Sequence, residues 1–178
     1  YHFDIQYQKN KIIILFLNFK MNIIDNEKTD IQELKDYQMT VKILSRLFKK
    51  YNPQFSQMAK GCVYDAKMYF TDYKNELYRY HIEIKSRRQN MEEYDTLPLT
   101  VQKYCNIIES CKLGEKPIYI SIVNDEEYYI FDLSRIDMNK VIIKNWYIND
   151  IEYSDNPTKK KIPTMFIPIT ESVNNGLI

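Results

Sequence analysis

Hydrophobic and polar residues alternate along residues 77–85, which read LYRYHIEIK. Side chains two positions apart on a β-strand point to the same face of the sheet. One face of the predicted strand therefore carries aromatic and aliphatic side chains, namely Tyr78, Tyr80, Ile82 and Ile84. The opposite face carries charged and ionisable side chains, namely Arg79, His81, Glu83 and Lys85. The pattern thus predicts a strand that fixes a carboxylate and an ammonium group side by side.

Two segments have the spacing of amphipathic helices instead. Apolar residues recur at helical spacing over Asp30–Tyr51, and Asn52-Pro53 is expected to end that helix. A second helix is expected from Leu97 to Cys111, with Pro98 in its first turn and Gly114 as its C-terminal stop.

Further strands and loops complete the expected order of elements. A strand over Gly61–Phe70 is predicted to turn at Thr71–Asn75 and pair with the alternating strand. The other expected segments are a loop at Ser86–Tyr94, strands at Pro117–Val123, Glu127–Leu133, Val141–Trp146 and Met165–Ile169, and a polar loop that contains Lys159, Lys160 and Lys161. This order predicts an α/β domain with three layers, in which helices flank a mixed central sheet.

The composition limits the classes of function. Only 3 of the 178 residues are glycine, and the sequence has no Gly-rich nucleotide-binding motif. The formal net charge is +1, so any nucleic-acid binding has to come from a local patch. The 3 cysteines lack a zinc-site spacing and suit reduced thiols in a cytoplasmic protein. The many Lys, Asn, Ile and Tyr residues suit a bacterial or phage source.

The first 20 residues have two interpretations. The apolar run Ile12–Leu17 is too short to span a bilayer, and no membrane partner is expected. The first methionine is Met21, so residues 1–20 are expected to be an extension that is non-native or disordered. The alternative is an additional edge strand over Lys11–Phe19. In either case, residues 21–178 are expected to form a single domain.

A second acid, Asp65, lies on the strand that is expected to pair with residues 77–85. Depending on the register of that hairpin, Asp65 lies across from Glu83 or from Lys85. Two carboxylates suit Mg²⁺ or Mn²⁺, which bind hard oxygen ligands, and the backbone carbonyl of Ile84 would complete the set. Lys85 would orient an attacking hydroxide or neutralise charge on a phosphoryl group. The alternative is that Glu83 and Lys85 form an ordinary ion pair on a solvated face.

Asp65, the triplet Glu83-Ile84-Lys85 and the helix that follows resemble the PD-(D/E)xK nuclease superfamily. The resemblance implies a restriction-endonuclease-like core and a metal-dependent nuclease that acts on DNA. It also implies that Asp65 and Glu83 bind the metal ion and that Lys85 assists the nucleophile. Members of this type usually act as dimers, so a homodimer is expected by analogy.

Two further residues are carried over from the same resemblance. Many members have a glutamate on the first helix, which Glu33 matches, and a glutamine on the helix after the motif, which Gln102 matches. Tyr64 stands before Asp65 where the motif often has proline, and that proline is often missing in the superfamily.

Basic residues near the motif are expected to hold a nucleic-acid backbone, since an arginine presents a planar fork to phosphate oxygens. They are Lys67, Arg79, Arg87 and Arg88. His81 is expected to be half-exposed beside them. Two alternatives remain open. The chain could be a catalytically inactive nuclease-fold subunit that binds nucleic acid or serves in assembly, or an enzyme that processes small phosphate compounds.

Overall fold

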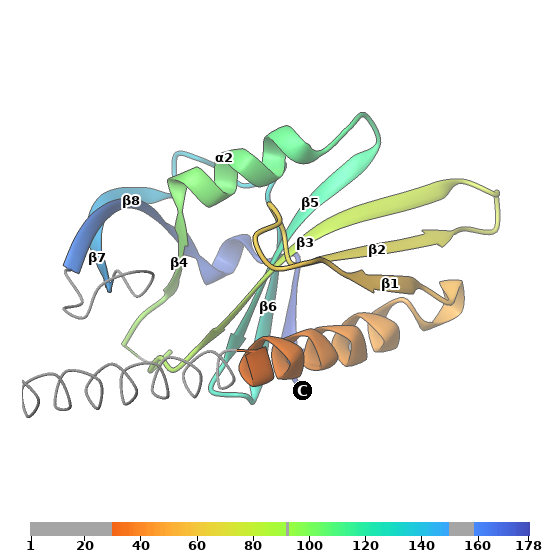
Figure 1. Ribbon diagram of the computed structural model, residues 1–178, viewed down its shortest axis with the longest axis horizontal. Helices are drawn as coiled ribbons and strands as arrows, with labels where there is room; N and C mark the ends of the chain where they lie inside the picture. The colour runs from red at the N-terminus through yellow and green to blue at the C-terminus, as the bar shows by residue number, and fades with distance from the viewer. Residues whose placement is uncertain (1–29, 92, 150–158) are drawn as a thin grey trace, which may run out of the picture. The chain divides into compact units, whose positions relative to one another are not determined.

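The computed structural model describes residues 30–91, 93–149 and 159–178 (Figure 1). The extension over residues 1–20 and the alternative strand over residues 11–19 lie outside the described residues. The chain divides into two compact units between Asp36 and Tyr37, and the second unit holds α2 and all of the described strands.

The first helix forms as its periodicity predicts. Residues 30–47 are helical, and a 3-10 turn, η1 (Lys49–Tyr51), follows. The helical segment ends at Asn52, which has a left-handed φ of 49° and precedes Pro53. The helix residues that belong to the second unit place Ile43 and Leu44 in the core.

A six-stranded sheet forms the centre of the second unit. Its strands, in spatial order, are β1 (Gln54–Gln57), β2 (Ala66–Thr71), β3 (Leu77–Arg87), β5 (Glu115–Val123), β6 (Glu127–Asp132) and β9 (Asn174–Leu177). β3 and β5 run parallel, whereas the other described neighbours in this sheet run antiparallel. The prediction of an α/β protein with a mixed sheet is therefore confirmed. The short strands β1 and β9 were not predicted.

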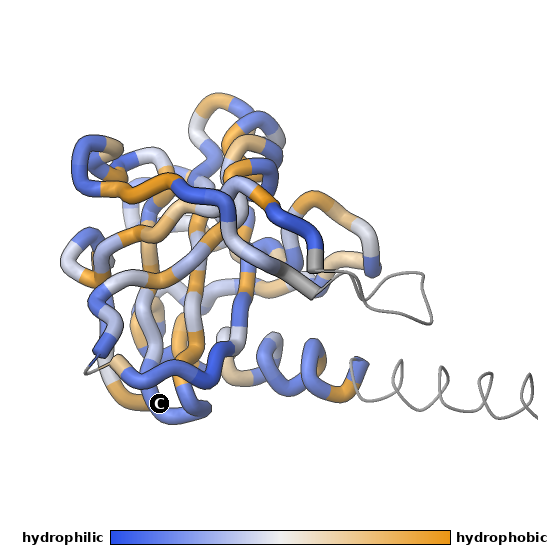
Figure 2. The backbone as a smooth tube through the Cα atoms, turned by 90° about the vertical axis from the view of Figure 1, so that its left-hand side faces the viewer, coloured by the Kyte–Doolittle hydropathy of each residue, from blue (hydrophilic) through white to orange (hydrophobic). Residues whose placement is uncertain are grey.

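Both faces of this sheet are covered. One face packs against residues 37–47 of the first helix through an apolar cluster that includes Tyr80, Ile82 and Ile84, as the alternation predicts. The other face lies towards α2 (Val101–Ser110), whose Ile107 is buried in a second cluster with Tyr119 (Figure 1). Figure 2 shows the changes between hydrophobic and hydrophilic residues along the strands.

A three-stranded sheet has the order β4-β8-β7 and corrects two predictions. β4 (Thr96–Thr100) occupies the start of the predicted second helix, and Pro98 pairs there with Phe166 instead of lying in a first helical turn. β8 (Lys159–Pro168) contains the lysines that were predicted to form a loop, and it pairs with β7 (Ile142–Asn149). The predicted strands Val141–Trp146 and Met165–Ile169 overlap β7 and the end of β8, so these two predictions are confirmed in part. Local periodicity missed β4, whose partner β8 lies far away in the sequence.

A tight turn joins β5 to β6. Asn124 and Asp125 both have positive φ, 54° and 61°, as the two central residues of a type I′ turn require, and the turn is closed by the hydrogen bond from the Glu126 N–H to the Val123 carbonyl at 3.0 Å. The chain continues after β8 through a short 3-10 turn, η2 (Ile169–Glu171), into β9. Among the described residues, no helix is long and apolar enough to cross a membrane.

Candidate active site

Asp65 lies directly before β2, and not within a strand as predicted. Residues 61–65 form turns and bends, and Gly61 has a φ of 86° there. The backbone of Asp65 is nevertheless fixed on both sides. Its N–H donates to the carbonyl of Ile82 at 2.9 Å, and its own carbonyl accepts from the N–H of Met58 at 2.9 Å. The segment before β2 is therefore held against β3 by backbone hydrogen bonds.

The register of the hairpin brings the two acids to the same place. Ala66 pairs with Ile82, so one further antiparallel step puts Asp65 opposite Glu83. The carboxylate of Asp65 also accepts a hydrogen bond through Oδ2 from the N–H of Ile84 at 2.7 Å. Ile84, predicted as a metal ligand through its carbonyl, thus already positions Asp65 through its amide.

Glu83 is a fully buried carboxylate with two cations on it. Its side chain is 0 % exposed, and Lys85 Nζ lies 2.8 Å from Oε1 while Lys103 Nζ lies 3.0 Å from Oε2. Apart from these lysines, the carboxylate has no hydrogen-bond donor among the described residues. Burial raises the pKa of Glu83, and the charges of Lys85 and Lys103 offset part of that rise. The two lysines therefore favour the ionised form of this buried acid.

Lys85 joins the two acids. Its Nζ lies 4.0 Å from Asp65 Oδ2 in addition to its contact with Glu83, and its side chain is 43 % exposed. Burial lowers the pKa of Lys85, but the charges of Glu83 and Asp65 outweigh that effect, so the net shift is upward. The structure thus brings together Asp65, Glu83 and Lys85, as the sequence predicted.

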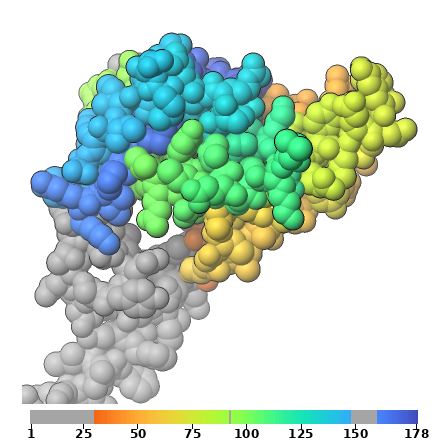
Figure 3. All heavy atoms as spheres, turned by 90° about the horizontal axis from the view of Figure 1, so that it is seen from above, coloured from red at the N-terminus to blue at the C-terminus, as the bar shows by residue number. Residues whose placement is uncertain are grey.

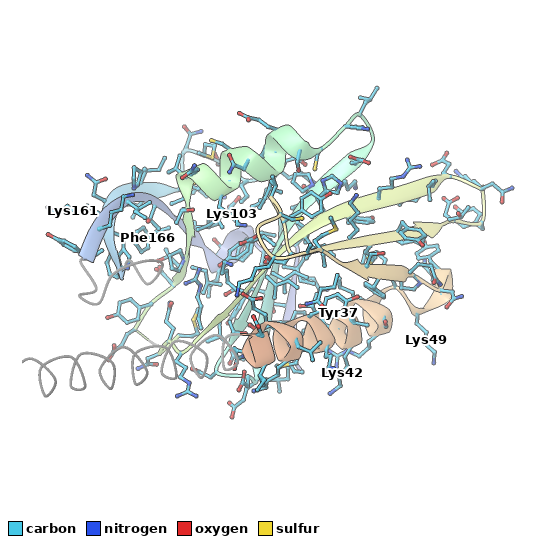
Figure 4. The ribbon with its side chains drawn as sticks, in the orientation of Figure 1. Tyr37, Lys42, Lys49, Lys103, Lys161 and Phe166 are labelled. Atoms are coloured by element: carbon cyan, nitrogen blue, oxygen red, sulfur yellow. The ribbon has the colours of Figure 1, made fainter. Side chains whose placement is uncertain are left out.

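Lys103 is a member of the site that was not predicted from the sequence. It lies in the first turn of α2, where its N–H donates to the Thr100 hydroxyl at 3.3 Å, and its Nζ contacts the carbonyl of Val63 at 3.0 Å (Figure 4). The sequence signal was Thr100, a good helix N-cap, which would have started the helix at residue 101. We call Asp65, Glu83, Lys85 and Lys103 the acid–lysine cluster.

The structure places the other two acid and amide candidates on exposed surface. Gln102 is exposed on α2, next in sequence to the lysine that contacts Glu83. Glu33 is exposed on residues 30–36, which belong to the first unit. Figure 3 shows α2 near the middle of one face of the molecule.

The four predicted phosphate-binding cations have different surroundings. The guanidinium of Arg87 contacts the carbonyl of Pro98 and the hydroxyl of Tyr119, so it is used inside the fold. Arg88 is exposed. Lys67 and Arg79 line a hollow of about 180 Å³ with other β2 and β3 residues. Three of the four cations thus remain available to a ligand.

His81 is buried, which corrects the expectation of a half-exposed side chain. Its ring stacks on Tyr64 with centroids 4.1 Å apart, and its Nε2 lies 3.4 Å from Glu115 Oε2. Burial lowers the pKa of His81, opposed by Glu115. Alternation along β3 predicts its face, but not that α2 covers that face.

The donor set suits a hard cation. Among the described residues, no group of three or more His, Cys, Asp or Glu side chains could hold a metal ion. Mg²⁺ needs only one or two carboxylates, because it keeps several water ligands. Ser121 is the register partner of Lys85 on β5, and its buried hydroxyl has no hydrogen-bond partner among the described residues. Asp65 and Glu83 are thus two carboxylates of the type that a hydrated divalent cation accepts, and both oxygens of Glu83 already contact lysines.

Comparisons with known proteins add no relative: no family model, no curated protein and no solved structure matches the chain. The function therefore has to be inferred from the geometry of the acid–lysine cluster.

Proposed function

We propose that the chain is a metal-dependent nuclease of the PD-(D/E)xK type that hydrolyses phosphodiester bonds in DNA. The observation that carries this proposal is the place of the Lys85 ammonium, 2.8 Å from Glu83 Oε1 and 4.0 Å from Asp65 Oδ2. One positive charge is held between two carboxylates on one side of the sheet. The resemblance to the PD-(D/E)xK superfamily requires these three side chains to lie together in this way.

Asp65 and Glu83 would hold Mg²⁺ or Mn²⁺ through carboxylate oxygens. When bound, the ion would lower the pKa of a water ligand and offset charge on a phosphate oxygen. The hydrogen bond from the Ile84 N–H fixes the Asp65 carboxylate, so this ligand is already oriented.

The lysines would have different tasks. Lys85 is 43 % exposed, so its ammonium can turn from the acids towards solvent and neutralise charge on a phosphoryl group or orient the attacking water. Lys103 is 26 % exposed and bound to Val63 as well as Glu83, so it would stay in place and keep the carboxylate ionised. The proposal therefore separates a mobile lysine from a fixed one.

The order of elements supports the proposed restriction-endonuclease-like core. A helix precedes the hairpin β2–β3, which carries Glu83 and Lys85 and has Asp65 at its start. α2 then leads to β5, which runs parallel to β3, and β6 returns antiparallel. Lys67, Arg79 and Arg88 would contact the DNA backbone.

The test is cleavage of a labelled DNA in the presence of Mg²⁺ or Mn²⁺. Lys85→Ala should lower the cleavage rate by about 10²-fold or more, because it removes a cation from the developing charge. Lys116→Ala is the matched control, since Lys116 is an exposed lysine on the neighbouring strand β5. Unfolding in urea checks that both variants remain folded.

Undiminished cleavage by folded Lys85→Ala would contradict the proposal, as would equal losses in both variants. Asp65→Asn adds a second readout, because it should weaken Mn²⁺ binding in calorimetry. A variant that binds Mn²⁺ as tightly as the unchanged protein would remove Asp65 from the metal site.

A second candidate is a nucleic-acid-binding subunit of the same fold without catalysis. The observation that favours it is that both oxygens of Glu83 already contact ammonium groups. An ion would then have to compete with Lys85 for the carboxylate. Absence of Mn²⁺ uptake, together with retained DNA binding, would support this candidate over the nuclease.

A further inference from the structure

The strands β7 and β8 carry an unusual combination of exposed rings, aliphatic side chains and lysines. Their sequences, IIKNWYIN and KKKIPTMFIP, contain four lysines and no acidic residue. Ile142 is 59 % exposed and Trp146 is 47 % exposed. β7 lies at the edge of the described three-stranded sheet. Neither the acid–lysine cluster nor the core accounts for this surface.

The register places these groups on one face. Ile142 pairs with Phe166, Lys144 with Thr164 and Trp146 with Ile162, and residues paired across a sheet point to the same side. Alternation along β8 adds Lys160 to that side. We call Ile142, Lys144, Trp146, Lys160 and Phe166 the Trp146 face; Figure 4 labels Phe166 on β8.

Contacts within the face hold its rings in place. Trp146 and Phe166 meet edge to face, with ring centroids 5.3 Å apart. Lys144 Nζ lies 4.4 Å from the ring centroid of Phe166 and 5.4 Å from that of Trp146. A tryptophan that is oriented by its neighbours and still half-exposed loses little freedom when a flat ligand stacks on it.

We propose that the Trp146 face binds single-stranded DNA. An unpaired base would stack on Trp146, and Lys144 and Lys160 would contact the flanking phosphates. Surfaces that bind single strands combine aromatic stacking platforms with cations along the backbone. A duplex fits less well, because its bases are stacked on one another and cannot reach a ring on a sheet.

The charge of the face decides between DNA and a second copy of the chain, which could also pair along the edge of β7. Pairing of two copies would bring Lys144 and Lys160 of each copy together, with no acidic residue on either strand to compensate them. Like charges across an interface are unfavourable, whereas a polyanion complements them. RNA offers the same unpaired bases and phosphates, so oligo-U RNA is compared with oligo-dT as an outcome of the test.

That the bound single-stranded DNA is also the substrate rests on the proposed function, but binding of this DNA can be measured separately. The chain contains 1 tryptophan, so intrinsic tryptophan fluorescence reports on Trp146 alone. The full chain is titrated with a 15-nucleotide oligo-dT in EDTA, where no metal-dependent cleavage occurs. We expect saturable quenching that weakens as salt is raised. A matched duplex and inorganic polyphosphate should quench less, since neither offers an unpaired base.

Variants are compared by the anisotropy of fluorescein-labelled oligo-dT. Trp146→Ala should weaken binding by about 10-fold, the effect of one stacked base, and Trp146→Phe should weaken it less. Tyr73→Ala is the matched control. Tyr73 is an 81 % exposed ring in a turn outside the Trp146 face, and Lys74 Nζ lies 5.8 Å from its ring centroid. The affinity of Tyr73→Ala for oligo-dT should equal that of the unchanged protein.

Three results would overturn the proposal. One is equal affinity of Trp146→Ala and Tyr73→Ala, and another is tighter binding of oligo-U RNA than of oligo-dT. The third is a dimer that Trp146→Ala dissociates in sedimentation while oligo-dT leaves the fluorescence unchanged, which would assign the face to a second copy. Binding is measured in EDTA, where metal-dependent cleavage does not occur, so failure of binding and failure of cleavage are distinguishable.

Discussion

Ile82 and Glu83 are neighbours on β3, and both side chains are 0 % exposed, yet opposite interactions keep them buried. Ile82 points to the face covered by residues 37–47 of the first helix and belongs to an apolar cluster. Glu83 points to the face covered by α2 and is held by Lys85 and Lys103. The two faces of one strand therefore allow stability and chemistry to be compared at adjacent positions.

The comparison shows which burial favours folding and which burial opposes it. Removing apolar surface from water favours folding at Ile82. Removing a carboxylate from water opposes folding at Glu83, and two ammonium groups are needed to compensate. A charge that is kept buried at such a cost is a reasonable place to look for function.

The largest effect should come from the apolar face. Ile82→Ala leaves a cavity in a fully buried cluster and should lower the free energy of unfolding by about 2–5 kcal/mol. Urea denaturation measures that loss. The affinity of the remaining folded protein for Mn²⁺ should not change, because the side chain points away from Asp65 and Glu83.

Ile82→Val is the matched control, with an expected loss of about 0.5–1.5 kcal/mol. A folded Ile82→Ala protein that had lost Mn²⁺ binding would show that the two faces are not independent.

A smaller loss is expected from Lys103→Met on the polar face. The variant keeps the length of the side chain but leaves Glu83 Oε2 without a cation, which should destabilise the protein by about 1–3 kcal/mol. The pKa of Glu83 is already raised by burial, and loss of Lys103 should raise it further. A protonated carboxyl carries no charge that a cation must compensate, so the destabilisation should be larger at neutral pH than near pH 4.

Unfolding of Lys103→Met in urea at neutral pH and near pH 4 tests whether the destabilisation is larger at neutral pH. Lys103→Arg retains a cation and serves as the control, with a smaller loss at neutral pH. A Lys103→Met loss that did not depend on pH would mean that packing, and not the charge of Glu83, explains it.

Short-range patterns were sufficient to predict the central fold. The alternation around Ile82 and the helical spacing of residues 30–47 are properties of adjacent residues, and both predictions are confirmed. The strand β4 was wrongly predicted as part of a helix, because Leu97 and Leu99 suit either structure and only pairing with β8 decides between them. β1 and β9 were missed because they are short edge strands with few apolar residues.

The candidate site was predictable only in part for the same reason. Asp65, Glu83 and Lys85 lie on two segments joined by one hairpin, so local register brings them together. Lys103 comes from α2, and its approach to Glu83 depends on how that helix packs on the sheet. The guanidinium of Arg87 is likewise used by Tyr119, a contact between residues that are far apart in the sequence.

His81 lies on the same face of β3 as Glu83. Burial disfavours the charged form of His81, whereas lysines compensate the charge of Glu83. The Ser110 hydroxyl donates to the carbonyl of Ile107 at 2.8 Å, so its oxygen accepts from His81 Nδ1 at 3.1 Å. The other groups around the ring are Glu115, Lys67, Cys111 and Tyr64.

The smallest effect should be the pH dependence that His81 contributes. Burial lowers its pKa below the value of about 6.5 that it has in the unfolded chain. As the pH falls through 6.5, the unfolded chain therefore takes up a proton first, and the free energy of unfolding decreases. His81→Gln should lose less stability than the unchanged protein between pH 7.5 and pH 5.5 in urea denaturation. The raised pKa of Glu83 acts in the opposite direction but is common to both proteins, so it cancels in the comparison. Equal pH dependence in the two proteins would mean that His81 is as easily protonated in the folded chain as in the unfolded one, so that its burial does not lower its pKa.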